Sequence, residues 1–363
     1  MPLDPIFRAA SYGEIAGWAH DDHDAAFRAF RLSALHALVT PYRSGSLGVD
    51  AAAFAPAFAE AAQVKPDEGP KGGPRAFFER HFRPFAVGDE AGFVTGFYEP
   101  QVEASPVRTA HFTVPLLGPP DDLVKLDDLD RPAGLDPSFA FGRASGEGIV
   151  EYFDRASIET GALGERAKPL AWLASKVDAF FIHVQGAARL LFPDGSVRRV
   201  TYAAKSGHPF TGPGRVLAGM GEIPPEEVTM QSIRAWFAKN PARIDEILHR
   251  NRSYIFFREA GVSDPALGPI AAAKVPLTAG RSVAVDRLLH SFATPFFIEA
   301  PTLLAFGDTP FSRLMIAQDT GSAITGPARG DLFAGSGDAA GEIAGVVRHK
   351  ARFFALLPHG SAA

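Results

Sequence analysis

Three aspartates in the last quarter of the sequence have surroundings suited to acid–base chemistry. Asp286 and Asp319 each follow a run of apolar residues, and Asp331 lies in the sequence Gly-Asp-Leu-Phe. Carboxylates are depleted within strands, and glycine lets the backbone turn sharply and a substrate come close. Apolar neighbours and a second carboxylate both raise the pKa of a carboxyl group. We therefore expect a general acid among these three; a turn or a cap is the alternative role for each.

The segment Asp319-Thr320-Gly321 also fits the signature of an aspartic protease. That chemistry needs two such loops that share one proton. The sequence contains no second Asp-Ser/Thr-Gly, so a protease site would require a homodimer.

Other catalytic classes lack their residues. The sequence has no cysteine, which excludes disulfides, thiolate catalysis, cysteine-bound metals and a lipid-modified cysteine. It has no Gly-x-Ser-x-Gly, His-Glu-x-x-His or phosphate-binding loop motif. Its 11 histidines are scattered. We expect no metal and no cofactor.

The composition describes an ordinary globular protein. Of 363 residues, 46% are hydrophobic, and the formal net charge is −5, which places the chain outside the disordered class. Because no basic stretch occurs, nucleic acid is not an expected partner. No window has the apolar length of a membrane span, and Met1–Pro5 shows neither region of a signal peptide. A monomer is expected.

Apolar spacing, caps and turn residues predict the elements that must position these groups. Helices are predicted through most of the first 85 residues, at 24–38, 51–62 and 76–82, and later where Thr229 and Pro241 can begin two more. The apolar face of the first comprises Phe27, Phe30, Ala34, Leu35 and Leu38. Residues 106–143 are predicted to be mostly loop. Strands are predicted at 93–98, in a hairpin over 180–203, and at 254–257, 281–286, 294–299, 313–319 and 351–357.

Two tryptophans, one tyrosine and two histidines are candidates for either ligand contact or core packing. Trp172 and Trp236 lie in apolar sequence and are predicted to be core residues, as is His183. His208, between a glycine and a proline, is predicted to lie in a loop that touches ligand. Tyr98 precedes Glu-Pro, where a strand must end, and is the predicted stacking residue.

Seven segments, in this order, resemble the membrane-bound lytic murein transglycosylase A family, including its C-terminal three-aspartate domain. They are TGFYEPQVEAS (95–105), LAWLASKVDAFFIHVQGAARL (170–190), YAAKSGHPF (202–210), NRSYIFFRE (251–259), VPLTAGRSVAVDR (275–287), RLMIAQDTGSAITG (313–326) and RGDLFAGSG (329–337). The sequence departs from the usual family pattern at Ala187, Ala188, Ala204, Ser206, Ser322 and in the turn after Arg287. These departures bear on substrate affinity more than on the reaction, because all three aspartates are present.

The resemblance implies a mainly β fold with a helical N-terminal segment and two domains with a groove between them. Residues 1–100 and 253–363 would form a discontinuous double-psi β-barrel domain. Residues 101–252 would form an inserted, β-barrel-like domain.

The resemblance also implies the site and the reaction. Asp331 would be the catalytic residue, with Asp319 and Asp286 in support. The residues expected to bind substrate lie in the matching motifs: Thr95, Tyr98, Gln185, Arg189, Lys205, His208 and Gly335. The enzyme would cleave peptidoglycan glycan strands at the β-1,4 bond after N-acetylmuramic acid and leave a 1,6-anhydro end.

One carboxyl group suffices for this reaction. A hydrolase needs a second carboxyl group to activate water or to attack the sugar, whereas here the attacking C6 hydroxyl is part of the substrate. A hydrolytic muramidase that uses two of the aspartates and a non-catalytic glycan-binding barrel are the alternatives. The resemblance further implies a periplasmic, outer-membrane-associated protein, with enzymes of cell-wall synthesis as possible protein partners.

Overall fold

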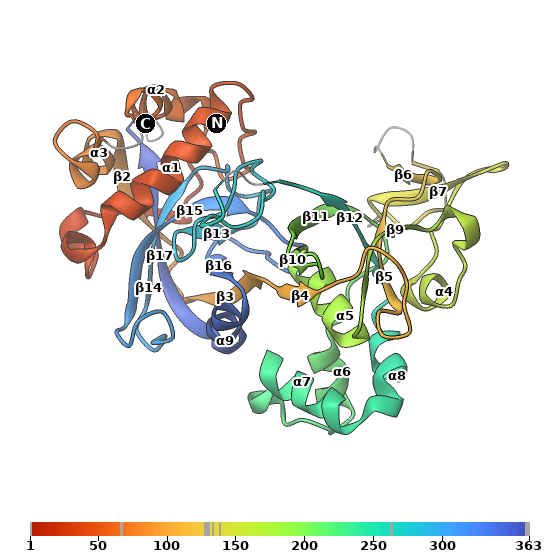
Figure 1. Ribbon diagram of the computed structural model, residues 1–363. Helices are drawn as coiled ribbons and strands as arrows, with labels where there is room; N and C mark the ends of the chain where they lie inside the picture. Colours follow the sequence, from red (N-terminus) through yellow and green to blue (C-terminus); the bar gives the residue numbers. More distant parts are fainter. Residues whose placement is uncertain are drawn as a thin grey trace. The chain divides into compact units, whose positions relative to one another are not determined.

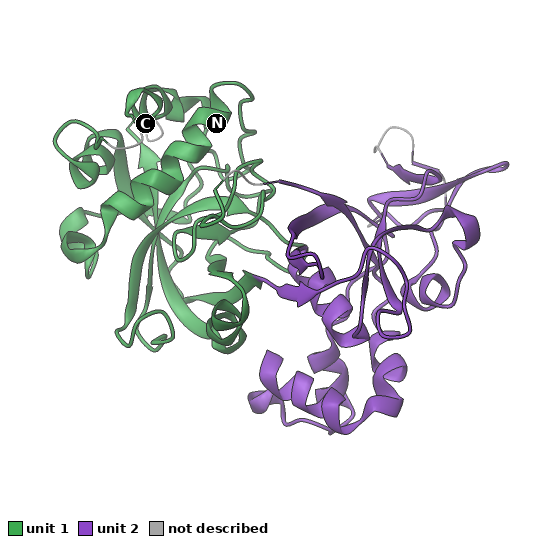
Figure 2. Cartoon of the chain, in the orientation of Figure 1, with its two compact units in different colours: residues 1–98, 262–363 green, residues 99–261 purple. Residues whose placement is uncertain are grey.

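The computed structural model describes residues 2–65, 68–126, 131–132, 134–137, 139–261 and 264–359. The chain forms two compact units (Figure 2). Unit 1 contains residues 1–98 and 262–363, and unit 2 contains residues 99–261. Strands dominate and helices are concentrated near the N-terminus and in unit 2 (Figure 1), which confirms the predicted mainly β class.

Unit 1 is built on one large sheet. Its strands are β1 (Phe7–Ala9), β2 (Phe82–Val87), β3 (Gly92–Glu99), β13 (Ser282–Ala284), β14 (Pro295–Ala300), β15 (Phe311–Asp319), β16 (Arg329–Ser336) and β17 (Arg348–Pro358). Their order is β1-β2-β17-β14-β15-β13-β16-β3. The first residues of β17 also pair with β3, so the six strands from β17 to β3 close into a ring. Strands β13 and β15 form a parallel pair in this sheet.

The helices of unit 1 are α1 (His23–Ala37), α2 (Ala55–Gln63), α3 (Pro74–His81) and α9 (Asp338–Val346), with 3-10 turns at Tyr12–Glu14, Trp18–His20 and Ala51–Phe54. The Asp22 carboxylate accepts a hydrogen bond from the Ala25 amide and so caps α1. The three predicted helices are confirmed, but the region before residue 85 also contains β1 and the start of β2, which the prediction missed.

The predicted apolar face of α1 is only partly buried. Phe27, Phe30 and Ala34 belong to the core, whereas Leu35 is 39% exposed and Leu38 is 54% exposed. Phe30 is surrounded by four other phenylalanine rings at centroid distances of 5.6–5.9 Å. Burying one such ring contributes roughly 1.5–3 kcal/mol, so this cluster holds α1, α2 and α3 together.

Unit 2 contains three smaller sheets. Its strands are β4 (Gln101–Glu103), β5 (Val114–Gly118), β6 (Leu123–Lys125), β7 (Phe141–Ser145), β8 (Gly148–Val150), β9 (Lys168–Leu173), β10 (Ala187–Leu191), β11 (Val197–Lys205) and β12 (Ile255–Glu259). They form the sheets β12-β11-β10-β4, β5-β9 and β6-β7-β8. The prediction of mostly loop over 106–143 was therefore wrong for β5, β6 and the start of β7.

The helices of unit 2 are α4 (Arg155–Glu159), α5 (Lys176–Gln185), α6 (Pro213–Gly219), α7 (Met230–Lys239) and α8 (Ile244–Leu248), with 3-10 turns at Gly164–Arg166, Pro225–Glu227 and Pro241–Arg243. Thr229 caps α7 through the Ser232 amide, and Pro241 opens the turn that leads into α8, as predicted.

The predicted hairpin over 180–203 was wrong in its first part. Residues up to Gln185 belong to α5. Ser175 caps the start of this helix, and Gly186, in a left-handed conformation with φ +75°, ends it. The hairpin consists only of β10 and β11.

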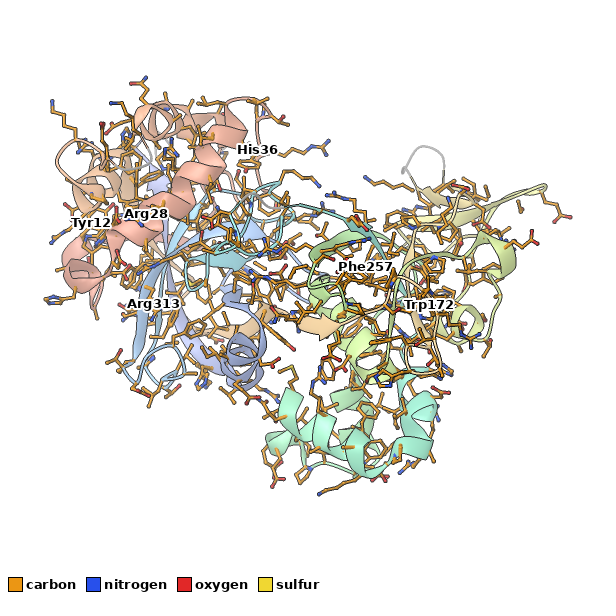
Figure 3. All side chains as sticks on the ribbon, viewed as in Figure 1. Tyr12, Arg28, His36, Trp172, Phe257 and Arg313 are labelled. Atoms are coloured by element: carbon orange, nitrogen blue, oxygen red, sulfur yellow. The ribbon has the colours of Figure 1, made fainter. Side chains whose placement is uncertain are left out.

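The core assignments have a mixed outcome. His183 is buried, and its Nδ1 lies 3.0 Å from the Arg155 guanidinium; Trp236 is also buried. Trp172, on β9 of unit 2 (Figure 3), is partly exposed, and the Arg108 guanidinium lies 5.9 Å from its ring centroid. The prediction is confirmed for His183 and Trp236 and was wrong for Trp172.

Candidate active site

Strand β13 brings two of the three aspartates together. Ala284 pairs with Asp319 on the parallel neighbour β15 and with Asp331 on the antiparallel neighbour β16. Residues directly opposite each other in a sheet project from the same face. The two carboxyl groups therefore lie on one face, on either side of Ala284, and both are partly exposed.

A β-bulge sets the direction of Asp319. Val283 pairs with Ala317, but the next residue, Ala284, pairs with Asp319, so Gln318 is the extra residue on β15. Its buried amide donates to the carbonyl of Ala29 on α1 at 2.8 Å. Bulges redirect side chains beside functional sites; without this one, Gln318 would stand where Asp319 now faces Asp331.

Apolar side chains pack on the face that carries the carboxyl groups. Phe333 lies two residues after Asp331 on β16, and its ring centroid is 5.2 Å from that of Phe97 on β3. Both rings belong to a buried cluster with Leu277, Ala284 and Ile324. Such surroundings disfavour a charged carboxylate.

The pKa values of both carboxyl groups are raised as a result. Burial and, to a smaller extent, the negative charge of Asp331 together raise the pKa of Asp319 to about 6, against the opposing effect of hydrogen bonds from the Ala272 and Thr320 amides. Burial also raises the pKa of Asp331, while a hydrogen bond from Thr95 and the positive charge of Arg329 oppose that rise. A group that must donate a proton near neutral pH needs such a shift.

Asp331 is held by a chain of two hydrogen bonds. The Thr95 hydroxyl, from β3, donates to Oδ1 of Asp331. The Arg329 guanidinium donates to Thr95 Oγ1 at 2.7 Å. Thr95, which was predicted to bind substrate, thus contacts the predicted catalytic carboxyl group.

Asp286 has a different position. Its Oδ1 accepts a hydrogen bond from the Leu288 amide at 3.0 Å, and its Oδ2 accepts one from the Gly326 amide at 2.9 Å. His290 Nε2 donates to the Pro327 carbonyl at 2.8 Å. Asp286 and His290 therefore fasten the loop that connects Asp319 to Asp331.

Two further residues of unit 1, Tyr98 and Gly335, were predicted to bind substrate, and neither presents an exposed ring to a ligand. Tyr98 is only 6% exposed, and its ring fits against Gly341 of α9, where an added Cβ would lie 2.9 Å from the ring. This burial does not support the predicted stacking of Tyr98 on a ligand. Gly335 has φ +126°, a conformation that favours glycine.

The other predicted substrate-binding residues belong to unit 2. Gln185 ends α5, and Lys205 ends β11. Arg189 donates to the fully buried Glu99 carboxylate at 2.8 Å, and Arg199 contacts the same carboxylate at 3.3 Å. This buried ion cluster lies within unit 2 and joins Glu99 to β10 and β11.

His208 was predicted to lie in a loop that touches ligand, but it is only 1% exposed. Its Nε2 donates to the Tyr152 carbonyl at 2.8 Å, and its ring packs against Phe139. These contacts give His208 a structural position, and direct contact with a ligand is not supported.

Arg329 is the site residue that the sequence analysis missed. It lies two positions before Asp331 on the same strand, so the two side chains share a face. That spacing within Arg-Gly-Asp was the available signal.

One group of described residues has the spacing of metal ligands. Atoms of Glu159, Asp245 and His249 lie within 4.8 Å of one another. Lys176 already donates to both oxygens of Asp245 at 2.6 and 2.7 Å, and Arg155 pairs with Glu159 at 2.8 Å. Since cations already neutralise these carboxylates, this group is better explained as an ion-pair network.

Comparison with known proteins covers most of the chain. Residues 93–258 match the family described as the MltA specific insert domain, and residues 281–357 match the 3D domain. Membrane-bound lytic murein transglycosylase A of Escherichia coli strain K12 is 33% identical over 267 residues, which are 72% of this chain. The matched region spans 64% of that relative's length.

Solved structures are similar in fold and sequence. The membrane-bound lytic murein transglycosylase from Agrobacterium tumefaciens is 49% identical, with 98% of each chain covered and a TM-score of 0.91. E. coli MltA with bound chitohexaose is 28% identical, with 79% of each chain covered and a TM-score of 0.62. Sequence, fold and the order of the motifs agree, and this chain belongs to the membrane-bound lytic murein transglycosylase A family.

Proposed function

We propose that this chain is a peptidoglycan lytic transglycosylase in which Asp331 is the single acid and base. The observation that carries the proposal is the environment of Asp331. Its carboxyl group is surrounded by protein, and among the described residues the side-chain hydrogen bond to it comes from Thr95 and reaches Oδ1. Burial favours the protonated form that begins the reaction. Thr95 and Arg329 favour the carboxylate that the first step produces.

The reaction divides into two proton transfers. Protonated Asp331 gives its proton to the glycosidic oxygen while the bond from that oxygen to C1 of N-acetylmuramic acid breaks. The C6 hydroxyl of the same sugar then bonds to C1, and its proton passes to the Asp331 carboxylate. The products are a new hydroxyl end and a 1,6-anhydro end, and no water is consumed. Since the nucleophile is tethered to the substrate, its effective concentration is high without a second carboxyl group.

A glycan strand is the proposed substrate. The E. coli neighbour binds chitohexaose, and the relatives are named for murein. We place this chain's activity at the periplasmic face of the outer membrane, where that polymer lies. Among the described residues, no helix has the length and hydropathy needed to cross a bilayer.

The proposed fold assignment follows from the strand order. Unit 1 would be a double-psi β-barrel, which the closed ring of six strands and the parallel pair of β13 and β15 support. Unit 2 would be the inserted domain, which the match over 93–258 supports.

Hydrolytic muramidase is the second candidate. It is favoured by the position of Asp319, whose carboxyl group lies on the same face as Asp331 and has a pKa of about 6. A typical glycoside hydrolase uses two carboxyl groups, one on either side of the glycosidic bond that it cleaves.

The test is to incubate the purified chain with murein sacculi in ¹⁸O-labelled water and to analyse the released ends by mass spectrometry. We expect 1,6-anhydro ends without ¹⁸O. Reducing ends that carry ¹⁸O would replace the proposal with the muramidase. Binding to sacculi with no soluble product would indicate a glycan-binding protein instead.

A further inference from the structure

We propose that Arg329 is a positioning residue that acts on Asp331 through Thr95 and makes Oδ2 the oxygen that carries the catalytic proton. The inference rests on the proposed function for its catalytic meaning. Its structural part concerns the orientation of one hydroxyl group and can be measured without substrate.

The donor inventory of these side chains fixes the direction of each hydrogen bond. A guanidinium group has only donors, and a threonine hydroxyl has one hydrogen and two lone pairs. Arg329 must therefore donate to Thr95 Oγ1, which lies 2.7 Å away. The single Thr95 hydrogen is then directed to Oδ1 of Asp331. Because Oδ1 accepts this hydrogen, a proton on the Asp331 carboxyl group is favoured at Oδ2.

Two further contacts hold Arg329 in place. Its guanidinium donates to the Gly330 carbonyl and lies 5.6 Å from the centroid of the Phe93 ring. Phe93 and Thr95 are both on β3, two residues apart, so they share a face. A planar group with several fixed donors suits this arrangement better than an ammonium group.

The charged groups around Asp331 explain why the chain of hydrogen bonds is needed. Asp319 on β15 is a second carboxyl group on this face, and its pKa is raised in part by the charge of Asp331, whereas β13 contributes only Ala284 at this position. Arg329 on β16 contributes the positive charge, and β3 contributes the neutral Thr95. Burial favours the protonated form of Asp331, while Thr95 and Arg329 favour its ionised form. An aspartate that serves first as acid and then as base needs both influences.

The experiment compares Arg329→Gln and Thr95→Val with the wild type and with matched controls. Arg352→Gln is the control for the arginine, because Arg352 also lies on a strand of unit 1 over a phenylalanine ring, that of Phe354 at 5.0 Å. Thr302→Val is the control for the threonine, since Thr302 is exposed and its hydroxyl contacts His349. Thr95→Ser keeps the hydroxyl group and tests rescue.

Two measurements are made on each variant. The pKa of Asp331 is measured by ¹³C carboxyl titration without substrate, with the signal assigned from Asp331→Asn. The pH dependence of kcat/KM for the release of anhydro ends is measured on sacculi. Circular dichroism and thermal melting verify that each variant is folded.

We expect the pKa of Asp331 to be about one pH unit higher in Arg329→Gln and in Thr95→Val, with little further change in the double variant. The alkaline limb of the activity profile should move in the same direction, and activity should fall on the order of tenfold. Thr95→Ser should restore the wild-type pKa of Asp331, and both controls should match the wild type.

An unchanged Asp331 titration in folded Arg329→Gln and Thr95→Val would overturn the inference, even if the wild type releases anhydro ends. If the wild type releases none while the titration shifts as expected, the proposed function fails and the positioning role of Arg329 stands.

Discussion

Asp319 faces Asp331 across Ala284, and the negative charge of Asp331 contributes to the raised pKa of Asp319. Among the described residues, Thr95 donates a hydrogen bond to Asp331 and Arg329 donates one to Thr95, whereas neither makes a hydrogen bond to Asp319. This asymmetry distinguishes the roles of two otherwise similar carboxyl groups.

Asp319→Asn should stabilise the protein at neutral pH. The folded pKa of Asp319 is about 6, above its ordinary value of 3.8, so the folded state binds more protons than the unfolded state between these values. Stability therefore falls as the pH rises through this range. We expect the variant to gain roughly 1–3 kcal/mol in the free energy of unfolding at pH 7 and nothing at pH 3. Urea unfolding over a pH series measures this difference. Equal pH dependence in wild type and variant would contradict the assigned pKa; Asp338→Asn, an exposed aspartate of α9, is the control.

Asp286→Ala should loosen the loop that connects Asp319 to Asp331. The substitution removes the acceptors of the Leu288 and Gly326 amides, at a cost of about 1–3 kcal/mol. Hydrogen exchange read by mass spectrometry should show faster exchange in peptides that cover 320–328. Asp194→Ala, which removes a local bond to Ser196 in an exposed turn of unit 2, should leave those peptides unchanged. Normal protection of the loop in Asp286→Ala would show that Asp286 has another role.

Glu99→Gln should destabilise unit 2. Glu99 is fully buried, and its carboxylate contacts Arg189 at 2.8 Å and Arg199 at 3.3 Å. Loss of this shared negative charge leaves two arginines beside a neutral amide, which costs about 3 kcal/mol for a buried pair. Thermal unfolding measures the effect. Glu68→Gln, which breaks an exposed pair with Lys65, should change stability by less than about 0.5 kcal/mol. Equal effects of the two substitutions would mean that the buried cluster is not a stabilising contact.

Periodicity predicted the amphipathic elements and failed where an element is buried on all sides. In α5, five consecutive residues from Ala179 to His183 are buried, so the sequence shows no helical period and resembles a buried strand. The cap at Ser175 and the terminating Gly186 were the local signals that favoured a helix.

At the candidate site, too, the sequence predicted some features and missed others. The apolar run before Asp319 predicted the strand that carries it. The prediction missed β16, which carries Asp331, and the bulge at Gln318 that directs Asp319, since the bulge depends on contacts with α1. Tyr98 was misassigned because α9, which its ring packs against at Gly341, was not predicted from its Gly- and Ala-rich sequence. Contacts between elements far apart in the chain have no local signature.

The most direct measurement of the central claim is the rate at which Asp331→Asn releases 1,6-anhydro ends from sacculi, compared with Asp338→Asn. An amide cannot donate the required proton, so we expect at least about a 100-fold loss in a variant whose thermal unfolding shows it to be folded. Asp338→Asn should keep the wild-type rate. If Asp331→Asn released anhydro ends at the wild-type rate, Asp331 would not be the acid of this reaction.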